Sequence, residues 1–180
     1  KSQSGDPRTY TININRQAAS ANNAGGNNNQ NNNNQNNTDV NITSGKYSIG
    51  TYITGIEPGT GAADFVKNIA VSASGTVKLL TSSGSENSGK IATGNKVAVY
   101  DASGNLKKTY DIVIYGDING DGAVNALDMI KLNRHILGKG TLTGAYLEAA
   151  DANRKGDGGN ALDMIIMNRH ILGKSKISQN

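Results

Sequence analysis

The sequence has few of the residues on which large protein cores depend, because its 180 residues include no cysteine, no tryptophan and one phenylalanine. Without cysteine, disulfide bonds contribute nothing to its stability. Aromatic residues make up 4% of the chain and glycine occurs 23 times, which favours small modules joined by flexible chain over one large core.

The sequence also lacks clustered positive charge and long apolar runs. Its formal net charge is +4 and its basic residues are scattered, without aromatic residues beside them, so we expect no nucleic-acid binding. No apolar run is long enough to insert across a membrane. Residue 1 is neither methionine nor the start of a signal peptide, so we expect a fragment of a longer protein.

The segment from Asp117 to Asp128 reads DINGDGAVNALD and has the spacing of a calcium loop. Oxygen-bearing side chains occupy its positions one, three, five, nine and twelve, and a glycine that permits a sharp turn occupies position six. Ca²⁺ takes about 6–8 oxygen ligands. The spacing therefore predicts coordination by the side chains of Asp117, Asn119, Asp121 and Asp128, by the carbonyl of Ala123, and by Asn125 through water.

The loop ends in aspartate where the EF-hand pattern has glutamate. The side chain of Asp128 is one methylene group shorter and reaches an ion less easily with both oxygens, so Mg²⁺ competes with Ca²⁺ as the predicted metal. An alternative without metal is a polar turn before a helix, because Asn125 and Asp128 also have the spacing of an N-cap with an acidic N3 residue.

The segment that follows this loop occurs twice. Residues 126–138 read ALDMIKLNRHILG and residues 161–173 read ALDMIIMNRHILG, and they differ only at Lys131/Ile166 and Leu132/Met167. Two copies predict two loop–helix repeats related by a pseudo-twofold axis.

These motifs, GDINGDG at 116–122 and the two NALDMI helices, resemble a dockerin over about the last third of the chain. The resemblance implies an all-α module of two EF-hand-like loop–helix repeats, which binds two Ca²⁺ ions and docks on a cohesin module of another protein. It also implies a secreted protein held in an extracellular or bacterial cell-surface assembly, such as a cellulosome for polysaccharide catabolism. Dockerin loops also end in aspartate, so the resemblance favours calcium over magnesium.

The second loop, residues 151–163, departs from the pattern because it is one residue longer and has Lys155 at position five. We expect Asp151, Asn153 and Asp163 to keep their roles as ligands and Asp157 to supply the missing carboxylate. This ion would be bound less tightly than the first. The alternative is a turn without an ion, held by helix capping alone.

Each repeat helix carries two apolar stripes. In the first helix Met129, Leu132 and Ile136 have the spacing of a core stripe. The second stripe would then face solvent, and an apolar surface rimmed by polar residues marks a partner site. Alternatively, both stripes belong to the core of a very small module.

The predicted docking residues combine this second stripe with the positions at which dockerins contact cohesin, and they are equivalent in the two repeats. They are Ala126, Leu127, Ile130, Asn133, Arg134 and Leu137 in the first repeat, and Ala161, Leu162, Ile165, Asn168, Arg169 and Leu172 in the second. The Ala-Leu pairs predict an interface dominated by apolar burial, with arginine at its edge.

His135 and His170 do not indicate an active site. Each lies near the predicted C-terminus of a helix, where a partly cationic side chain meets the negative end of the helix dipole. No base–nucleophile constellation accompanies them, so we expect no catalysis by this chain.

The region before the repeats begins with two segments that have little capacity to form a core. Residues 1–16 contain one alternating strand that resembles the last strand of a cadherin-like β-sandwich domain. Residues 17–46 include an Asn/Gln tract and are predicted to be a disordered linker, with a prion-like segment as the alternative.

Residues 47–115 have the alternation of a small β-rich domain. The patterns predict strands over 47–56, 76–80, 96–100 and 107–115, a helix over 62–69, and a hairpin turn over 101–105. The domain resembles the immunoglobulin-like X modules that precede dockerins and stabilise them or extend the cohesin interface. No linker separates it from residue 116, so we expect the two modules to be in contact.

Residues 116–180 would be the dockerin, with a short connecting helix within 139–150 and a tail that brings Ile177 to Tyr115. The predicted fold is therefore multi-module: a β-rich domain, of α+β or immunoglobulin-like type, followed by an all-α dockerin. The predicted function is non-catalytic, calcium-dependent cohesin binding by a protein that is monomeric without cohesin.

Two other classes of function remain in competition with this prediction. The chain could be the C-terminal fragment of a secreted glycoside hydrolase or another enzyme whose catalytic domain lies upstream. It could also be a calcium sensor of the calmodulin type, which would bind amphipathic helical peptides, whereas a dockerin binds a folded β-sandwich.

Overall fold

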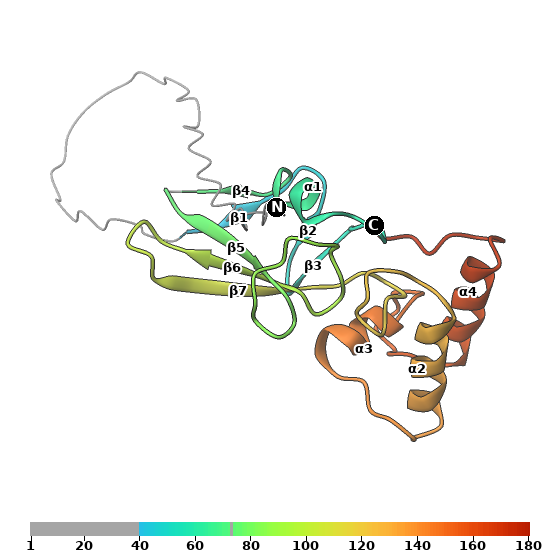
Figure 1. Cartoon of the computed structure of the whole chain (residues 1–180). Coiled ribbons are helices and arrows are strands. Elements are labelled where there is room, and N and C mark those ends of the chain that lie inside the picture. The colour runs from blue at the N-terminus through green and yellow to red at the C-terminus, as the bar shows by residue number, and fades with distance from the viewer. Residues whose placement is uncertain (1–39, 73) are drawn as a thin grey trace, which may run out of the picture.

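The computed structural model describes residues 40–180 except residue 73, and these residues form a β-rich domain followed by three helices (Figure 1). The strand predicted within residues 1–16, and the predicted linker as far as residue 39, lie outside the described residues. In the described part of the chain, no helix has the length and apolar character needed to cross a membrane.

The β-rich domain contains a five-stranded sheet and a two-stranded sheet. The strand order of the larger sheet is β2–β3–β7–β6–β5, with bounds Ser48–Ile49, Tyr52–Thr54, Leu106–Ile112, Lys96–Tyr100 and Thr76–Leu80. The smaller sheet pairs β1, Ile42–Thr43, with β4, Ala70–Val71. A short helix, α1, covers Ala62–Val66.

The hairpin of β6 and β7 is the centre of the larger sheet. The strands are antiparallel and pair from Lys96 with Asp111 to Tyr100 with Leu106, with a bulge between Val99 and Tyr100. Asp101 closes the turn, because its side-chain oxygen accepts N–H groups of the residues two and four positions later. The hairpin turn predicted over 101–105 is therefore confirmed.

The core of this domain lies between the larger sheet and α1. Val97 and Val99 of β6 and Ile112 of β7 are all buried in it. On the other side, the ring of Phe65 on α1 stacks on Tyr47 with centroids 5.0 Å apart. The predicted helix over 62–69 and the strands over 76–80 and 96–100 are thus present, although α1 ends at Val66.

The first predicted strand, residues 47–56, is wrong as a single element. It forms a hairpin, in which β2 and β3 pair antiparallel and Gly50 occupies the turn. β3 then pairs in parallel with the end of β7 at Asp111 and Ile112. The predicted strand over 107–115 ends at Ile112, and the chain continues without regular pairing toward residue 116.

The domain also includes the C-terminal part of the predicted linker, residues 40–46, so this boundary of the prediction is wrong. Val40 and Ile42 are buried in the same hydrophobic cluster as α1 and the large sheet. The strands β1 and β4 each contain two residues, which is too short for alternation to be visible in a sequence.

The helical module consists of α2, Ala126–Ile136, α3, Gly144–Ala150, and α4, Ala161–Ile171. The helices α2 and α4 pack against each other, and α3 lies in the connection between them, as Figure 1 shows. Leu132 and Met167 are completely buried in the core that the helices share. The connecting helix expected within 139–150 is confirmed as α3.

The tail returns to the junction between the two modules. The side chain of Gln179 accepts the N–H of Tyr115 at 2.8 Å and donates to its carbonyl at 2.9 Å. Ile177 is buried in the same cluster as Tyr115. The predicted return of the tail to Tyr115 is therefore confirmed, and Gln179 adds a contact beyond the predicted one.

Candidate metal loops and docking face

Both loops are tied to the helix that follows them by the carboxylate at their last position. In the first, Asp128 Oδ1 accepts the N–H groups of Ile118 and Asn119 at 2.8 and 2.9 Å, and Oδ2 accepts the N–H of Asn125 at 2.9 Å. The side chain of Asn125 in turn accepts the N–H of Leu127, so α2 begins with a capping box.

The second loop repeats this arrangement. Asp163 accepts the N–H groups of Asn153 and Asn160 at 2.9 and 3.0 Å, and Asn160 accepts the N–H of Leu162. The capping that was an alternative to a metal site is present in both loops. This capping does not exclude an ion, because the capping carboxylates of Asp128 and Asp163 are also the predicted ligands at the last position of each loop.

Asp117, at position one of the first loop, is completely buried. Its Oδ1 accepts the N–H groups of Gly120 and Asp121, both at 3.0 Å, and its Oδ2 accepts those of Thr93 and Gly122 at 2.8 and 3.1 Å. The pKa of the Asp117 carboxyl is raised to about 6; burial is the main cause and the charge of Asp128 adds to it, while the N–H donors act in the opposite direction. A cation beside these carboxylates would favour their charged form.

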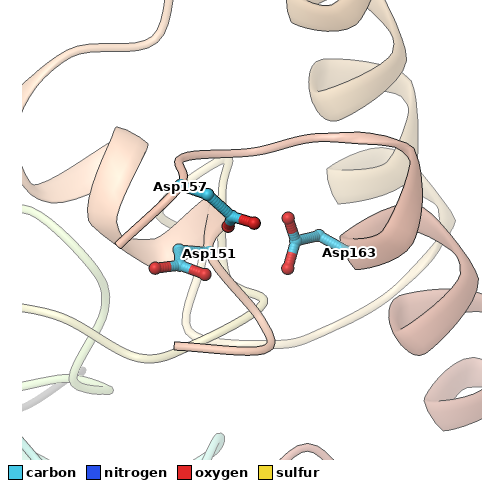
Figure 2. Close-up of side chains that lie close together, drawn as sticks. All are labelled: Asp151, Asp157 and Asp163. Carbon is cyan, nitrogen blue, oxygen red and sulfur yellow. The ribbon is translucent and has the colours of Figure 1, made fainter. Parts of the chain in front are cut away.

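The second loop brings its three carboxylates together. Figure 2 shows Asp151, Asp157 and Asp163 directed toward a common space, and their ligand oxygens lie within 4.8 Å of one another. In the part of the chain that the structure describes, no other group of three acidic, histidine or cysteine side chains has its ligand atoms so close to one another. Burial raises the pKa of the Asp163 carboxyl, and the charges of Asp151 and Asp157 raise it as well.

The position of Asp157 shows how the longer second loop accommodates its extra residue. Glycines precede and follow it, at 156 and 158, and both have positive φ angles of 72° and 70°. The chain can therefore bulge at this point, which directs the Asp157 carboxylate toward the other two. The donor set is made of oxygen atoms and carries negative charge, so it fits a hard divalent cation such as Ca²⁺.

The first loop has the more regular sequence but a less convergent set of side chains. Asp121 Oδ2 accepts the side-chain amide of Asn119 at 2.8 Å, and its Oδ1 accepts the N–H of Ala123 at 2.9 Å. These contacts hold Asp121 within its own turn. The predicted ligands all belong to this loop, and an ion would replace part of the internal hydrogen bonding.

The predicted docking stripe is exposed in both repeats. Its six leucine and isoleucine side chains are between 53% and 59% exposed; they are Leu127, Ile130, Leu137, Leu162, Ile165 and Leu172. Ala126, Asn133, Arg134, Ala161, Asn168 and Arg169 are also exposed. The alternative that both stripes are core is therefore excluded for this stripe.

The predicted core stripe needs one correction. Leu132 is completely buried and Met129 packs against the core, but Ile136 is 39% exposed. Ile136 is the last residue of α2, so the core stripe ends one turn earlier than its spacing predicts.

A groove of about 560 Å³ lies beside the first stripe. It is lined by Leu127, Ile130 and Arg134 on α2 and by residues 140–142 of the following loop. The guanidinium of Arg134 donates to the carbonyl of Lys139 at 3.4 Å, which places a positive charge at the groove. Such an arrangement, apolar with a basic edge, can bury a complementary protein surface.

The two histidines have a structural role. His135 Nδ1 accepts the N–H of Leu142 at 3.3 Å, and His170 Nδ1 accepts the N–H of Ile177 at 3.0 Å. Each histidine thus fixes the chain that leaves its helix, in the same way in both repeats.

Comparison with known proteins gives one match. Residues 115–172 match the family model of the dockerin type I domain. The search of the curated proteins and the search of the solved structures found no match. The helical part of the chain is therefore a dockerin module, preceded by a β-rich domain.

Proposed function

We propose that this dockerin module binds a cohesin module of another protein in a calcium-dependent manner, and so attaches its parent protein to an extracellular complex. Dockerins are non-catalytic interaction modules of secreted, cellulosome-type assemblies. The observation that carries the proposal is the pairing, in each repeat, of an oxygen-rich loop with an exposed apolar helix stripe.

The proposed role of calcium follows from the charge of the loops. Asp151, Asp157 and Asp163 have carboxylates within 4.8 Å of one another, and like charges at this distance repel. A bound Ca²⁺ ion would supply the compensating positive charge and would favour the loop geometry from which α4 begins. We propose one ion in each EF-hand-like loop, with the ligand sets predicted from the sequence.

The proposed docking surface is the exposed stripe, with Leu127 and Ile130 at its centre in the first repeat and Leu162 and Ile165 in the second. Burial of leucine and isoleucine side chains on a partner removes apolar area from water, which favours association. A calmodulin-type sensor is less well supported, because the first loop follows β7 through a short irregular segment and no helix leads into it.

We also propose that the β-rich domain is a companion of the dockerin in the manner of an X module. Direct contacts across the junction support this proposal: Gly59 donates its N–H to the carbonyl of Gly122 at 2.9 Å, and Thr93 donates to Asp117. The parent protein can still be an enzyme, such as a glycoside hydrolase, whose catalytic domain lies elsewhere.

The test is a calorimetric titration of the chelated chain with Ca²⁺, followed by titration with a type I cohesin in calcium and in chelator. We expect two equivalents of Ca²⁺, a gain of helix by circular dichroism, and cohesin binding only in calcium. The variant Asp157→Ala should remove one equivalent. Failure to bind either Ca²⁺ or cohesin would contradict the proposal, and binding of an amphipathic helical peptide instead would favour a sensor.

A further inference from the structure

We propose that one loop of the β-rich domain, residues 91–95, holds the first calcium loop in its ion-binding shape, and that the second calcium loop has no such support. We call residues 91–95 the bracing loop. The affinity of the first loop for Ca²⁺ would then depend on the β-rich domain, whereas that of the second would not. This inference rests on the proposed calcium binding and specifies how the β-rich domain takes part in it.

The central contact joins Thr93 of the bracing loop to Asp117 at position one of the calcium loop. The backbone N–H of Thr93 donates to Asp117 Oδ2 at 2.8 Å, and both residues are buried. A hydrogen bond between a backbone N–H and a buried carboxylate is among the stronger ones in a protein. It fixes the orientation of a predicted ligand from outside the ligand's own loop.

The backbones of the two loops also approach unusually closely. A Cβ atom added at Gly120 would lie 2.9 Å from the carbonyl oxygen of Thr93, and one added at Gly122 would lie 2.5 Å from that of Ile91. Together with the hydrogen bond from Gly59 to the carbonyl of Gly122, these contacts place positions four to six of the calcium loop against the β-rich domain.

The bracing loop is itself firmly attached behind this contact. Thr93 Oγ1 accepts the N–H of Ile114 at 3.1 Å and donates to its carbonyl at 3.2 Å. Gly94 donates its N–H to the carbonyl of Ile112, the last residue of β7. The bracing loop is therefore hydrogen-bonded both to the end of β7 and to the segment that leads from β7 into Asp117.

The second calcium loop lacks this arrangement within the described residues. The N–H groups that donate to Asp151, at its position one, are those of Lys155 and Gly156, and both belong to the same loop. A Cβ atom added at Gly156 would meet nothing within 4 Å. The two repeats have nearly the same helix sequence, so the difference in support comes from the β-rich domain.

Preorganisation of a site raises affinity, because less conformational freedom is lost when the ligand binds. We therefore expect Ca²⁺ to fill the first loop at lower concentration than the second. The sequences of the loops predict the same order of affinities, so this order alone does not test the proposal. The test is whether the affinity of the first loop depends on the bracing loop.

The test uses the full chain and follows each loop separately by NMR during a Ca²⁺ titration, with the amides of Gly120 and Gly156 as reporters. Thr93→Pro removes the N–H that donates to Asp117. Thr93→Ala keeps this N–H but, like Thr93→Pro, loses the threonine hydroxyl and methyl groups, so it is the matched control. We expect Thr93→Pro to weaken Ca²⁺ binding at the first loop by about tenfold or more, as the loss of a hydrogen bond to a charged group implies. Binding at the second loop should change by less than about twofold.

A second pair of variants guards against general misfolding by Thr93→Pro. Gly94 has a φ of 84°, which is strained for a residue with a side chain, and a Cβ added there would collide with the ring and hydroxyl of Tyr146, so Gly94→Ala strains the bracing loop. Gly104 has a similar φ of 80° but open space around it, so Gly104→Ala introduces the same backbone strain far from the calcium loop.

We expect Gly94→Ala to weaken the first loop selectively and Gly104→Ala to leave both loops unchanged. Unchanged affinity at the first loop in Gly94→Ala, or an equal loss at both loops, would overturn the inference. These results differ from a failure of the proposed function, in which the unmodified chain would bind no Ca²⁺ at either loop.

Discussion

Leu132 on α2 and Met167 on α4 occupy the same position in the two repeats, and both are completely buried in one hydrophobic cluster. This is one of the two positions at which the helix repeats differ, with leucine in the first repeat and methionine in the second. The two repeats thus place a buried side chain at the same position of the dockerin core, but the two side chains differ in shape.

Leu132→Ala and Met167→Ala should each destabilise the dockerin module strongly. Removal of such a buried side chain costs about 2–5 kcal/mol in the free energy of unfolding, because it leaves a cavity as well as losing apolar burial. Urea denaturation in calcium, followed by circular dichroism, measures this cost. Leu127→Ala is the control and should change stability little, since Leu127 is exposed; an equal loss in the control would contradict the assignment of core and surface.

The exposed stripe can be tested separately from stability. Ile130→Glu and Ile165→Glu together should reduce cohesin binding by at least about tenfold, because each buries a charge at an apolar interface. Melting temperatures should change little. Leu106→Glu is a matched control, since Leu106 and Ile130 are both 56% exposed but Leu106 lies on β7. Equal affinity of the double variant and the unmodified chain would place the docking surface elsewhere.

Gln179→Ala should loosen the attachment of the tail. It removes two hydrogen bonds and leaves the buried N–H and carbonyl of Tyr115 without that partner. Each unsatisfied buried group lowers the free energy of unfolding by about 1–3 kcal/mol. Lys176→Ala, at an exposed position of the same tail, should have almost no effect. Hydrogen exchange of the Tyr115 amide would show the change directly, and unaltered protection would argue against the contact.

The capping boxes predict matched effects in the two repeats. Asn125→Ala and Asn160→Ala each remove the side-chain oxygen that accepts an N–H of the first helical turn. Each should lower the free energy of unfolding by about 1 kcal/mol, the usual cost of losing an N-cap. Chemical denaturation in saturating Ca²⁺ gives the values, and a large difference between the two variants would mean that the repeats are not equivalent.

The sequence alone predicted the dockerin module well, for a physical reason. The calcium loop pattern, the N-caps and the helix stripes are local, so their spacing appears directly in the residues from 117 to 138 and again from 151 to 173. The position of the Asp157 carboxylate could be anticipated because glycines flank this residue, and the structure directs it to the carboxylates of Asp151 and Asp163.

The parts that the sequence did not predict depend on contacts between distant residues. The donation from Thr93 to Asp117 uses a backbone N–H, which every residue except proline has, so no side-chain pattern could indicate it. The strands β1 and β4 exist because Ile42 pairs with Val71, and each is too short to have a period. Ile136 is exposed at the last position of α2, and the apolar spacing within a helix does not show at which turn the core stops covering it.

The way β7 leaves its sheet determines how the β-rich domain would respond to mechanical tension. Tension on the chain at Tyr115 would reach the β-rich domain through β7, which ends at Ile112. Two sets of residue pairs would carry it: the parallel pairing of β7 with β3 at Asp111 and Ile112, and the five antiparallel pairs of β7 with β6. A pull on the dockerin module would therefore be borne by the middle of the larger sheet, and not by one of its edges.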